Sequence, residues 1–365
     1  MKILFDHQYF STQKYGGITR YFAGLNEGLN KRPGIKSTIA ALYSENAYLP
    51  KGLLPLNNVI GRKIFNGHTN RLFRWNKRYA NYLIKQGNYD IFHPTYYDTY
   101  FLDIVRTPFV ITVHDMIHEA LPHFFPDATE VIARKKQLIE QAGTIIAISA
   151  YTKQQIINYY PQVEGKIKVV HHGYILNQTS ASALILPAKY ILFVGDRAFY
   201  KNFATFIKCI GSLLQHDKSL HLICAGGGLF TQEEKLIVTD FNISAQCRQL
   251  TVTDAQLKQL YIQATVFAFP SYQEGFGLPL LEAFANDCPV VCSNATCFPE
   301  IAGDAALYFD PMDGTSIKQA VAKVLNDDDI RRVLITKGKQ RLQSFTFDSC
   351  VDNTIQVYKA LIKSI

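Results

Sequence analysis

Residues 265–284 read TVFAFPSYQEGFGLPLLEAF, and the pattern of this stretch changes within a few residues. It opens on TVFAF, a short apolar run typical of a buried strand. It ends on LPLLEAF, whose leucines are typical of a buried helix and whose Pro279 suits a first helical turn. Between them lie Gly275 and Gly277, which a core helix would not tolerate so near its start. The stretch therefore predicts a strand, a loop and a helix in succession, which is the building unit of an α/β fold.

The same alternation runs through the whole chain. The strand-like runs are KILFDH, STIAALY, DIFHPTYY, FVITVHD, TIIAIS and IKVVHHG, then YILFVGD, LHLICAGG, CRQLTV, TVFAFPS, PVVCSN and AALYFD. Helical periods lie between them, as in Ile18, Tyr21, Phe22, Leu25 and Leu29, which share one helix face. Strands that alternate with helices predict parallel sheets, here in two doubly wound, Rossmann-like α/β domains.

The length of 365 residues is about twice that of a typical domain. We expect an N-terminal domain over residues 1–172, a linker over 173–189 and a C-terminal domain over 190–347. The linker is expected because residues 173–189 are small and polar and lack a helical period. Two such domains in tandem predict a ligand cleft between them, facing the carboxyl ends of the strands.

The amino-acid composition and the cysteine pattern exclude several classes of protein. Hydrophobic residues make up 48% of the chain and charged residues 19%, which excludes a disordered protein. No run reaches the roughly 18 apolar residues of a membrane span, and the start MKILFDHQYF is too short for a signal-peptide core. The seven cysteines form no C-x-x-C pair, which favours a reducing compartment and argues against zinc. We expect a cytoplasmic protein without a bound metal.

The net charge of +8 is unevenly distributed. Residues 51–89 hold eight basic residues and no acidic one, interleaved with leucines, isoleucines and aromatic residues. Such a segment can lie on anionic lipid headgroups at the inner face of a membrane. An ordinary solvated helix face explains it as well. Nucleic acid is not expected, because no nucleic-acid motif accompanies the charge.

The segment KYGGITRYF places Gly16 and Gly17 just before the helix that begins near Ile18. Glycines at a helix N-terminus let a phosphate approach the backbone N–H groups, and Arg20 in the first turn can add a charged contact. A simple turn is the alternative, since the pair matches neither nucleotide-binding glycine motif.

The segment TVHDMIHEALP follows a strand-like run with polar side chains. His114 is best interpreted as a strand-end contact to substrate, and Asp115 as a helix cap or an orienting partner. His114 and His118 have the spacing of a zinc pair, but the metalloprotease motif needs Glu where Asp115 stands.

In YILFVGDRAFYKNF, a strand is followed by Gly195, Arg197, Lys201 and Asn202. Two cations placed after a strand can neutralise a diphosphate. The alternative is that both are surface residues of a loop.

The loop of the opening stretch carries two carboxylates, Glu274 before the glycines and Glu282 in the helix. Carboxylates bind vicinal hydroxyls well because they accept two hydrogen bonds, so one can hold a sugar and the other a ribose. The backbone N–H groups of Gly275, Phe276, Gly277 and Leu278 would face the phosphates between them.

EGFGLPLLE resembles the E-x7-E element of family 4 of the retaining glycosyltransferases, which have the two-domain GT-B fold. The resemblance extends to YGGITRYF, to His114, to GDRAFYKN and to SNATCFPEIAGDAALYFDP, and so covers nearly the whole chain. It implies that the glycine loop and the Arg197/Lys201 pair hold the diphosphate of a nucleotide sugar and that His114 contacts the sugar. It implies that Glu274 binds sugar hydroxyls and Glu282 the ribose. Family members commonly have Arg directly after the glycine, whereas Asp196 intervenes here.

By the same resemblance, Thr251, Val252 and Thr253 offer backbone groups to the nucleobase, and a last helix over 348–365 crosses back to the first domain. The opening of the chain is most similar to bacterial polysaccharide and O-antigen transferases, including mannosyl- and rhamnosyltransferases. The implied reaction moves a hexose from a nucleoside diphosphate sugar to a saccharide or lipid-linked saccharide, with retention and without a metal.

Other functions stay open at this point. A metal-dependent transferase would use Asp-x-Asp, but Asp327-Asp328-Asp329 is typical of a surface helix start. A sugar-nucleotide epimerase shares the architecture, as would a catalytically silent nucleotide-sugar-binding subunit. A dehydrogenase is not expected, because AGGG, at Ala225 to Gly228, lacks the dinucleotide spacing.

Overall fold

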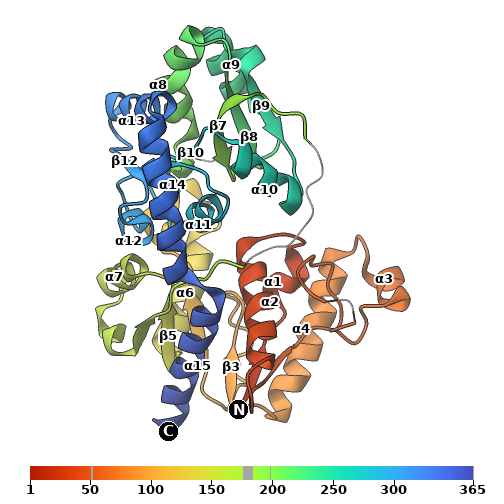
Figure 1. Cartoon of the computed structure of the whole chain (residues 1–365). Helices are drawn as coiled ribbons and strands as arrows, with labels where there is room; N and C mark the ends of the chain where they lie inside the picture. Colours follow the sequence, from red (N-terminus) through yellow and green to blue (C-terminus); the bar gives the residue numbers. More distant parts are fainter. Residues whose placement is uncertain (51, 176–183, 198, 365) are drawn as a thin grey trace. The chain divides into compact units, whose positions relative to one another are not determined.

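The structure is a computed structural model that describes residues 1–50, 52–175, 184–197 and 199–364. The chain divides into two compact units (Figure 1). Unit 1 comprises Met1–Gly173 and Phe347–Ile365, and unit 2 comprises Tyr174–Thr346. Of the linker expected over 173–189, residues 176–183 lie outside the described residues.

Unit 1 is built on parallel strands. Its strands are β1 (Lys2–Phe5), β2 (Lys36–Ile39), β3 (Ile91–His93), β4 (Val110–Val113), β5 (Thr144–Ala147) and β6 (Ile167–Val169). They pair in the orders β2-β1-β3 and β4-β5-β6, and an isolated parallel bridge between Phe92 and Phe109 links the two groups. The prediction of a parallel sheet in the first domain is confirmed.

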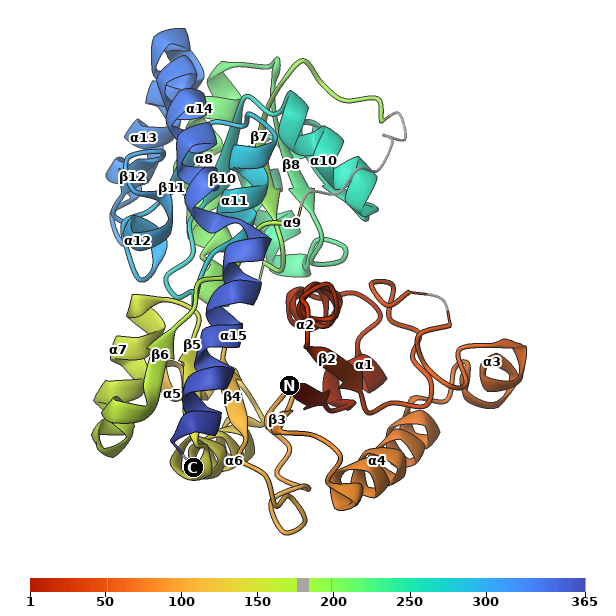
Figure 2. The same ribbon diagram turned by 60° about the horizontal axis from the view of Figure 1, so that its bottom comes forward.

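Helices cover both faces of this sheet. They are α1 (Gln8–Thr12), α2 (Gly17–Asn30), α3 (Val59–Phe65), α4 (Thr69–Gln86), α5 (Ile117–Ala120), α6 (Ala128–Gln141), α7 (Ala150–Tyr159) and α15 (Phe347–Lys363), with short 3-10 turns at Pro122–Phe124 and Pro161–Lys166. One core contains apolar residues of α2 and α15, and a second contains residues of α4, α6 and α7. Within unit 1, α3 and α4 lie at one edge and α7 at the opposite edge (Figure 2).

The helix predicted from the spacing of Ile18 to Leu29 is α2. It buries Tyr21, Phe22, Leu25 and Leu29, which is the apolar face that the sequence indicates. The last helix, α15, packs in the same core, where Val351 and Tyr358 are fully buried.

Unit 2 is a six-stranded sheet in which every pairing is parallel. Its strands are β7 (Lys189–Val194), β8 (Leu220–Ala225), β9 (Cys247–Leu250), β10 (Val266–Phe269), β11 (Val290–Ser293) and β12 (Leu307–Phe309), in the order β12-β11-β10-β7-β8-β9. The reversal of strand order beside β7 makes the sheet doubly wound, as predicted.

The helices of unit 2 are α8 (Phe203–His216), α9 (Gln232–Asp240), α10 (Asp254–Gln263), α11 (Leu278–Ala285), α12 (Phe298–Ala302), α13 (Gly314–Asn326) and α14 (Asp328–Leu342), with 3-10 turns at Phe199–Lys201, Ser244–Gln246 and Gln343–Phe345. One core joins α8, α9 and α13 to the sheet. On α14, Asp327 is the N-cap and its carboxylate accepts from the N–H of Ile330, so the triple-aspartate string is a helix start, as predicted.

Candidate active site

Four loops of unit 2 meet at one edge of its sheet. They follow β10, β7, β8 and β9, which are neighbours in that order. Because all four strands run in the same direction, their carboxyl ends share one edge, which is where α/β proteins bind ligands. This edge collects the sequence-predicted residues of the second domain, from Gly195 to Leu278.

Lys201 and Glu274 form the central contact at this edge. The Lys201 Nζ lies 2.5 Å from Glu274 Oε1, and the two side chains are only 17% and 12% exposed. The backbone N–H of Tyr272 donates to the carbonyl of Tyr200 at 2.7 Å, which ties the two loops together beside the ion pair. The structure thus brings together two residues that the sequence assigned to one site from separate motifs.

The loop that holds Glu274 leads directly into α11. Pro279 lies in the first turn, as the sequence predicts, and Gly277 is the N-cap with φ of 89°. A side chain at Gly277 would be strained at that φ, and its Cβ would lie 3.1 Å from the Phe298 ring. The Cys297 thiol donates to the carbonyl of Glu274 at 3.4 Å. The backbone that precedes α11 is therefore fixed from several sides.

Glu282 lies one turn into α11, and the structure shows what orients it. The Tyr261 hydroxyl, on the buried side of α10, donates to Glu282 Oε2 at 3.2 Å. Burial, then the charge of Glu282, raises the pKa of Tyr261 well above its ordinary value. The phenol therefore remains a proton donor to the carboxylate at neutral pH.

Arg197 has a different environment from Lys201. Its side chain is 3% exposed, and its Nε lies 2.8 Å from Oε1 of Glu234, which is 7% exposed. Its two terminal nitrogens donate to the carbonyls of residues 226, 227, 228 and 229 at 2.9 to 3.3 Å. The guanidinium therefore binds the loop after β8. The alternative that Arg197 is an exposed surface residue of its own loop is wrong.

The loop after β8 is the AGGG segment. Gly226, Gly227 and Gly228 have φ of 92°, 69° and 70°, so three consecutive residues adopt the left-handed conformation that only glycine adopts readily. At Gly227 a Cβ would also lie 2.7 Å from an Arg197 nitrogen. The three glycines and the Arg197 side chain therefore pack together at the carboxyl end of β8.

Four further predicted residues lie around the same edge. Thr251 and Val252 follow β9, and Thr253 caps α10 in a capping box with Gln256. Asn202 caps α8 at φ of 58°, is buried, and donates from Nδ2 to the carbonyl of Pro311 at 3.0 Å. Thr251 and Thr253 are exposed, whereas the Asn202 amide binds the protein itself.

The predicted residues of the first domain lie in unit 1. Gly16 is the N-cap of α2 and Gly17 its first residue, so the glycine pair does stand at a helix N-terminus. A Cβ at Gly16 would lie 2.2 Å from the oxygen at the end of the Gln13 side chain, so a larger residue there would require that side chain to move. Arg20 lies in the first turn, and its backbone N–H donates to the carbonyl of Gly16.

His114 follows β4 and is buried among rings. Its imidazole lies near Tyr21 and Phe22 and stacks at 5.5 Å on the imidazole of His172. Burial, followed by the charges of His93 and Lys135, lowers the pKa of His114 to about 3. Its Nε2 has no hydrogen-bond partner among the described residues. A neutral imidazole with an unused nitrogen is suited to a polar contact with a ligand.

Asp115 and His118 have separate surroundings. Asp115 accepts from the backbone N–H of Ile117 at 3.1 Å, just before α5, whose N-cap residue is Met116. The buried Lys135 donates to the Asp115 carbonyl at 3.1 Å and pairs with Glu119 at 2.9 Å. The ring of His118 lies on Phe125 and that of His114 on His172, and no group of metal-binding side chains occurs in the described ranges.

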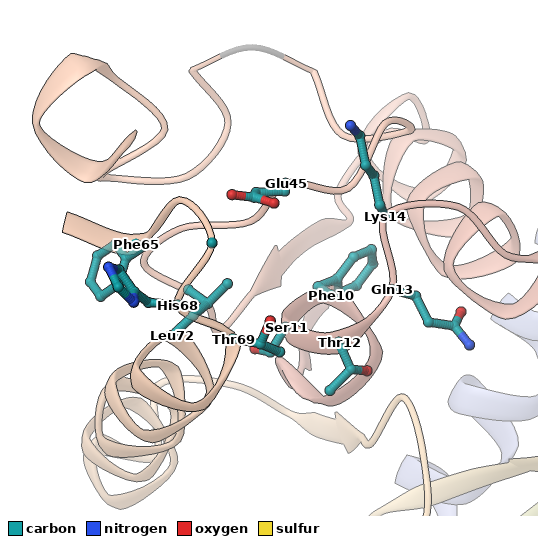
Figure 3. A pocket seen from close by; sticks show the side chains of 11 residues that line it. Phe10, Ser11, Thr12, Gln13, Lys14, Glu45, Phe65, His68, Thr69 and Leu72 are labelled. Carbon is teal, nitrogen blue, oxygen red and sulfur yellow. The ribbon is translucent and has the colours of Figure 1, made fainter. Parts of the chain in front are cut away.

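Unit 1 also contains a cavity of about 220 Å³ beside α1 and the start of α4 (Figure 3). Phe10, Ser11 and Leu72 line it and are buried. Lys14, Glu45, His68 and Thr69 line it as well and are exposed. The cavity therefore combines a buried base with polar groups at its mouth.

Comparisons with known proteins agree with this geometry. Residues 177–341 match the family model described as glycosyl transferases group 1, and residues 15–178 match that of glycosyltransferase family 4. Together the two matches include every predicted site residue. The chain belongs to glycosyltransferase family 4. The glycosyltransferase is therefore of the retaining class and takes its sugar from a nucleotide-sugar donor.

Among curated proteins, the glycosyltransferase is similar to O-antigen chain mannosyltransferase B of Escherichia coli, with 28% identity over 69% of this chain and 70% of the relative. It is also 28% identical to O-antigen chain mannosyltransferase RfbU of Salmonella typhimurium, over 66% of this chain and 67% of the relative.

Solved structures share the fold. Sucrose-phosphate synthase from Thermosynechococcus elongatus has a TM-score of 0.75 at 17% identity, with both chains covered completely. The Anabaena protein HepE in complex with UDP and glucose has a TM-score of 0.72 at 17% identity, with 98% of each chain covered. The predicted GT-B fold of the glycosyltransferase is thereby confirmed. In the described ranges, its helices are all too short or too polar to cross a lipid bilayer.

Sequence reasoning missed three residues that contact predicted site residues within their own units. His172 follows β6 as His114 follows β4, so the same strand-end argument applied to IKVVHHG would have found it. Glu234 lies in the capping box TQEE, which indicates a helix start but not its arginine partner. No pattern in the sequence indicates that Tyr261 contacts Glu282, because only the packing of α10 against α11 brings the two side chains together.

Proposed function

We propose that this enzyme transfers a hexose of the mannose or rhamnose type from a nucleoside diphosphate sugar to a hydroxyl of a saccharide acceptor, in the assembly of a bacterial surface polysaccharide or lipopolysaccharide. The observation that carries the proposal is the Lys201–Glu274 ion pair at the carboxyl edge of the sheet. The two O-antigen mannosyltransferases among the relatives support the sugar type and the pathway.

The donor would be held from several directions. We assign Lys201 to the diphosphate, together with Gly195 and the N–H groups of Gly275 to Leu278 before α11, where the helix dipole favours an anion. Glu282, oriented by Tyr261, would accept hydrogen bonds from the ribose. The backbone at Thr251, Val252 and Thr253 would meet the base.

Glu274 and His114 would contact the transferred sugar. Glu274 would accept from its hydroxyls once Lys201 turns to the phosphate, and the neutral His114 would offer its unused Nε2. Gly16 and Gly17 would let the diphosphate approach α2, with Arg20 and Asp115 toward the acceptor. Arg197, which the sequence assigned to the phosphate, would act through the glycine loop that its guanidinium holds.

The transition state should resemble an oxocarbenium ion, with negative charge growing on the departing diphosphate. Lys201 and the backbone N–H groups would stabilise that charge without a metal ion. We propose front-face attack, in which the leaving phosphate oxygen takes the proton of the acceptor hydroxyl. Retention of configuration then needs no covalent intermediate on the protein.

The experiment is a matrix of donors and acceptors. UDP, GDP, dTDP and ADP are first compared by thermal shift, since a ligand at 100 times its Kd adds roughly 2.7 kcal/mol to stability. The sugars of the preferred nucleotide are then supplied with lipid-linked saccharides, and NMR reports the anomeric configuration of the product. We expect an α-linked product from an α-linked donor, at the same rate in EDTA.

The same matrix separates the alternative functions. Conversion of the donor sugar without an acceptor would identify an epimerase. Nucleotide binding without turnover for any pair would identify a silent subunit. Loss of the reaction in EDTA would contradict the metal-free mechanism.

We propose that the enzyme works in the cytoplasm. All seven cysteines hold free thiols, five of them buried, and a reducing compartment keeps thiols in that form. Fractionation of cells that express the tagged chain would test this location.

A further inference from the structure

We propose that α3 and the outward face of α4 form a docking surface for a membrane with anionic lipid headgroups. The surface comprises Val59, Ile60, Arg62, Lys63 and Ile64 of α3. On α4 it comprises Arg71, Arg74, Trp75, Arg78 and Tyr82. Both helices lie at one edge of unit 1 (Figure 2).

The first half of this docking surface is apolar. Val59 is 71% exposed, Ile60 64% and Ile64 37%, although α3 has only seven residues. The helix is firmly held, because the Asn58 side chain accepts from the N–H groups of Ile60 and Gly61 at 2.9 and 3.1 Å. At Gly61 a Cβ would lie 1.9 Å from the Leu56 carbonyl, so the inner side of α3 is in close contact. The aliphatic side chains cannot turn inward, and they remain in water until something covers them.

The second half is a stripe on α4. Arg71, Arg74, Trp75, Arg78 and Tyr82 stand at i, i+3, i+4, i+7 and i+11, which is one helix face. All five are exposed, Trp75 by 48% and Tyr82 by 58%, whereas the buried residues of α4 are Leu72, Asn76, Ala80 and Ile84.

The two halves of the surface are continuous and suit a membrane interface. The Trp75 ring lies edge-on to Phe65 of α3 at 6.2 Å, so α3 and the stripe join. Tryptophan, tyrosine and arginine together are the residues that lie best between headgroups and acyl chains.

The charge of the surface is uncompensated. Residues 51–89 contain no acidic side chain. Lys77, beside the stripe, pairs with Asp98 at 3.4 Å, but none of the described carboxylates pairs with Arg62, Lys63, Arg74 or Arg78. Anionic headgroups supply the missing negative charge, and the acyl region covers the aliphatic side chains of α3.

A membrane explains the surface better than the two other interpretations. A helix face that is exposed only to water would gain nothing from two isoleucines and a valine that point outward, because their apolar surface would stay hydrated. A nucleic acid would satisfy the arginines through its phosphates but would leave those aliphatic side chains in water.

The surface also adjoins the cavity of Figure 3. Phe65, at the end of α3, and His68 and Thr69, at the start of α4, line that cavity. A saccharide that is attached to a membrane lipid would therefore be presented beside the cavity, an argument that rests on the proposed function.

The test measures sedimentation of the full chain with vesicles. Two kinds of vesicle are compared. One contains phosphatidylcholine with about 30% phosphatidylglycerol, an anionic lipid fraction on the order of the physiological one, and the other contains phosphatidylcholine alone. We expect binding to the anionic vesicles only, weakening as salt rises. The variant R74Q/R78Q should bind about thirtyfold more weakly, because two cations are lost near the surface. The variant I60S should also bind more weakly, but with an unchanged salt dependence.

The matched control is K318Q/K323Q, which removes two exposed cations from α13 of unit 2 and should bind as the wild type does. Thermal unfolding of each variant verifies the fold, and nucleotide binding verifies the donor site independently. The proposal is overturned if the wild type does not bind anionic vesicles, if R74Q/R78Q binds as well as the control, or if a DNA oligonucleotide displaces the vesicles with higher affinity.

Discussion

Lys201 and Glu274 lie 73 residues apart in the sequence, and in unit 2 their charged groups are 2.5 Å apart. The ion pair fixes the position of the Lys201 ammonium at the sheet edge, and each side chain compensates the charge of the other. In the mechanism that we propose, the lysine exchanges one anionic partner for another when a diphosphate enters. The proposed catalytic cation would then be in position before the substrate arrives, which lowers the cost of organising the site.

Replacement of Lys201 by Ala should lower kcat/KM by roughly 10² to 10³, the usual loss for one charge-stabilising donor. The variant should lose most of the thermal stabilisation by the preferred nucleoside diphosphate and still fold, because the pair is partly exposed. The matched control is K208A, on the outer side of α8, which should have wild-type rates. Normal turnover in K201A would remove Lys201 from the mechanism.

Arg197 and Glu234 should behave as one unit. R197A and E234A each leave a buried charge without its partner, which costs about 3 to 5 kcal/mol of unfolding free energy. The double variant should cost clearly less than the two single losses combined, because the second change removes the orphaned charge. Urea unfolding measures all three. A fully stable R197A that has lost only nucleotide affinity would instead identify Arg197 as a direct ligand of the diphosphate.

The glycine loop offers a comparison of two neighbouring residues. Gly227 and Gly228 have nearly the same φ, 69° and 70°, so an alanine at either costs about 1 to 2 kcal/mol in backbone conformation. At Gly227 the new Cβ would also lie 2.7 Å from an Arg197 nitrogen and 3.0 Å from the Gly195 carbonyl oxygen, whereas at Gly228 there is no atom within 4 Å. G227A should therefore be less stable than G228A by a further 1 to 3 kcal/mol. Equal stabilities would contradict the close contacts at Gly227.

Unit 1 should be sensitive to acid. Burial lowers the pKa of His93 and His114 to about 3, and that of His172 well below its usual value. Below pH 6.5 the unfolded chain binds protons that these folded histidines do not bind. The contribution of these three histidines to stability should therefore be constant above pH 6.5 and fall below it, by about 1.4 kcal/mol per pH unit for each such histidine.

Unfolding free energies at pH 7.5, 6.0 and 5.0 test this dependence. H93Q should reduce the slope between pH 6 and 5, although it also loses the hydrogen bonds to Tyr358 and Thr112 and is less stable at pH 7.5. H216Q, at the exposed end of α8, is the control and should leave the slope unchanged. An identical slope in H93Q and the wild type would contradict the assignment.

The sequence predicted the elements of this fold well, because their signals are local. Each strand is a short apolar run between turn residues, and α2 has its apolar residues at helical spacing. The loop before α11 was predicted for the same reason, since Gly277 and Pro279 specify a helix start by their own backbone geometry.

The partners of the site residues could not be predicted in this way. Arg197 and Lys201 are both cations in one short segment, yet one is buried against Glu234 and the other reaches Glu274. That difference depends on which loops the sheet order brings together, from residues 37 and 73 positions away. The position of β7 between β8 and β10 decides it, and no local pattern encodes that strand order.

The chain order of unit 1 has a consequence for how the protein is made. Its core includes Val351 and Tyr358 of α15, and at Gly28 of α2 there is no room for a side chain against Val351. A ribosome synthesises all of residues 174–346 before it reaches these two side chains. Unit 2 is continuous in sequence and can complete its fold during synthesis. The first 173 residues cannot bury the apolar surface that contacts α15 until α15 has been synthesised. We therefore expect a chaperone to bind that exposed surface of the nascent chain.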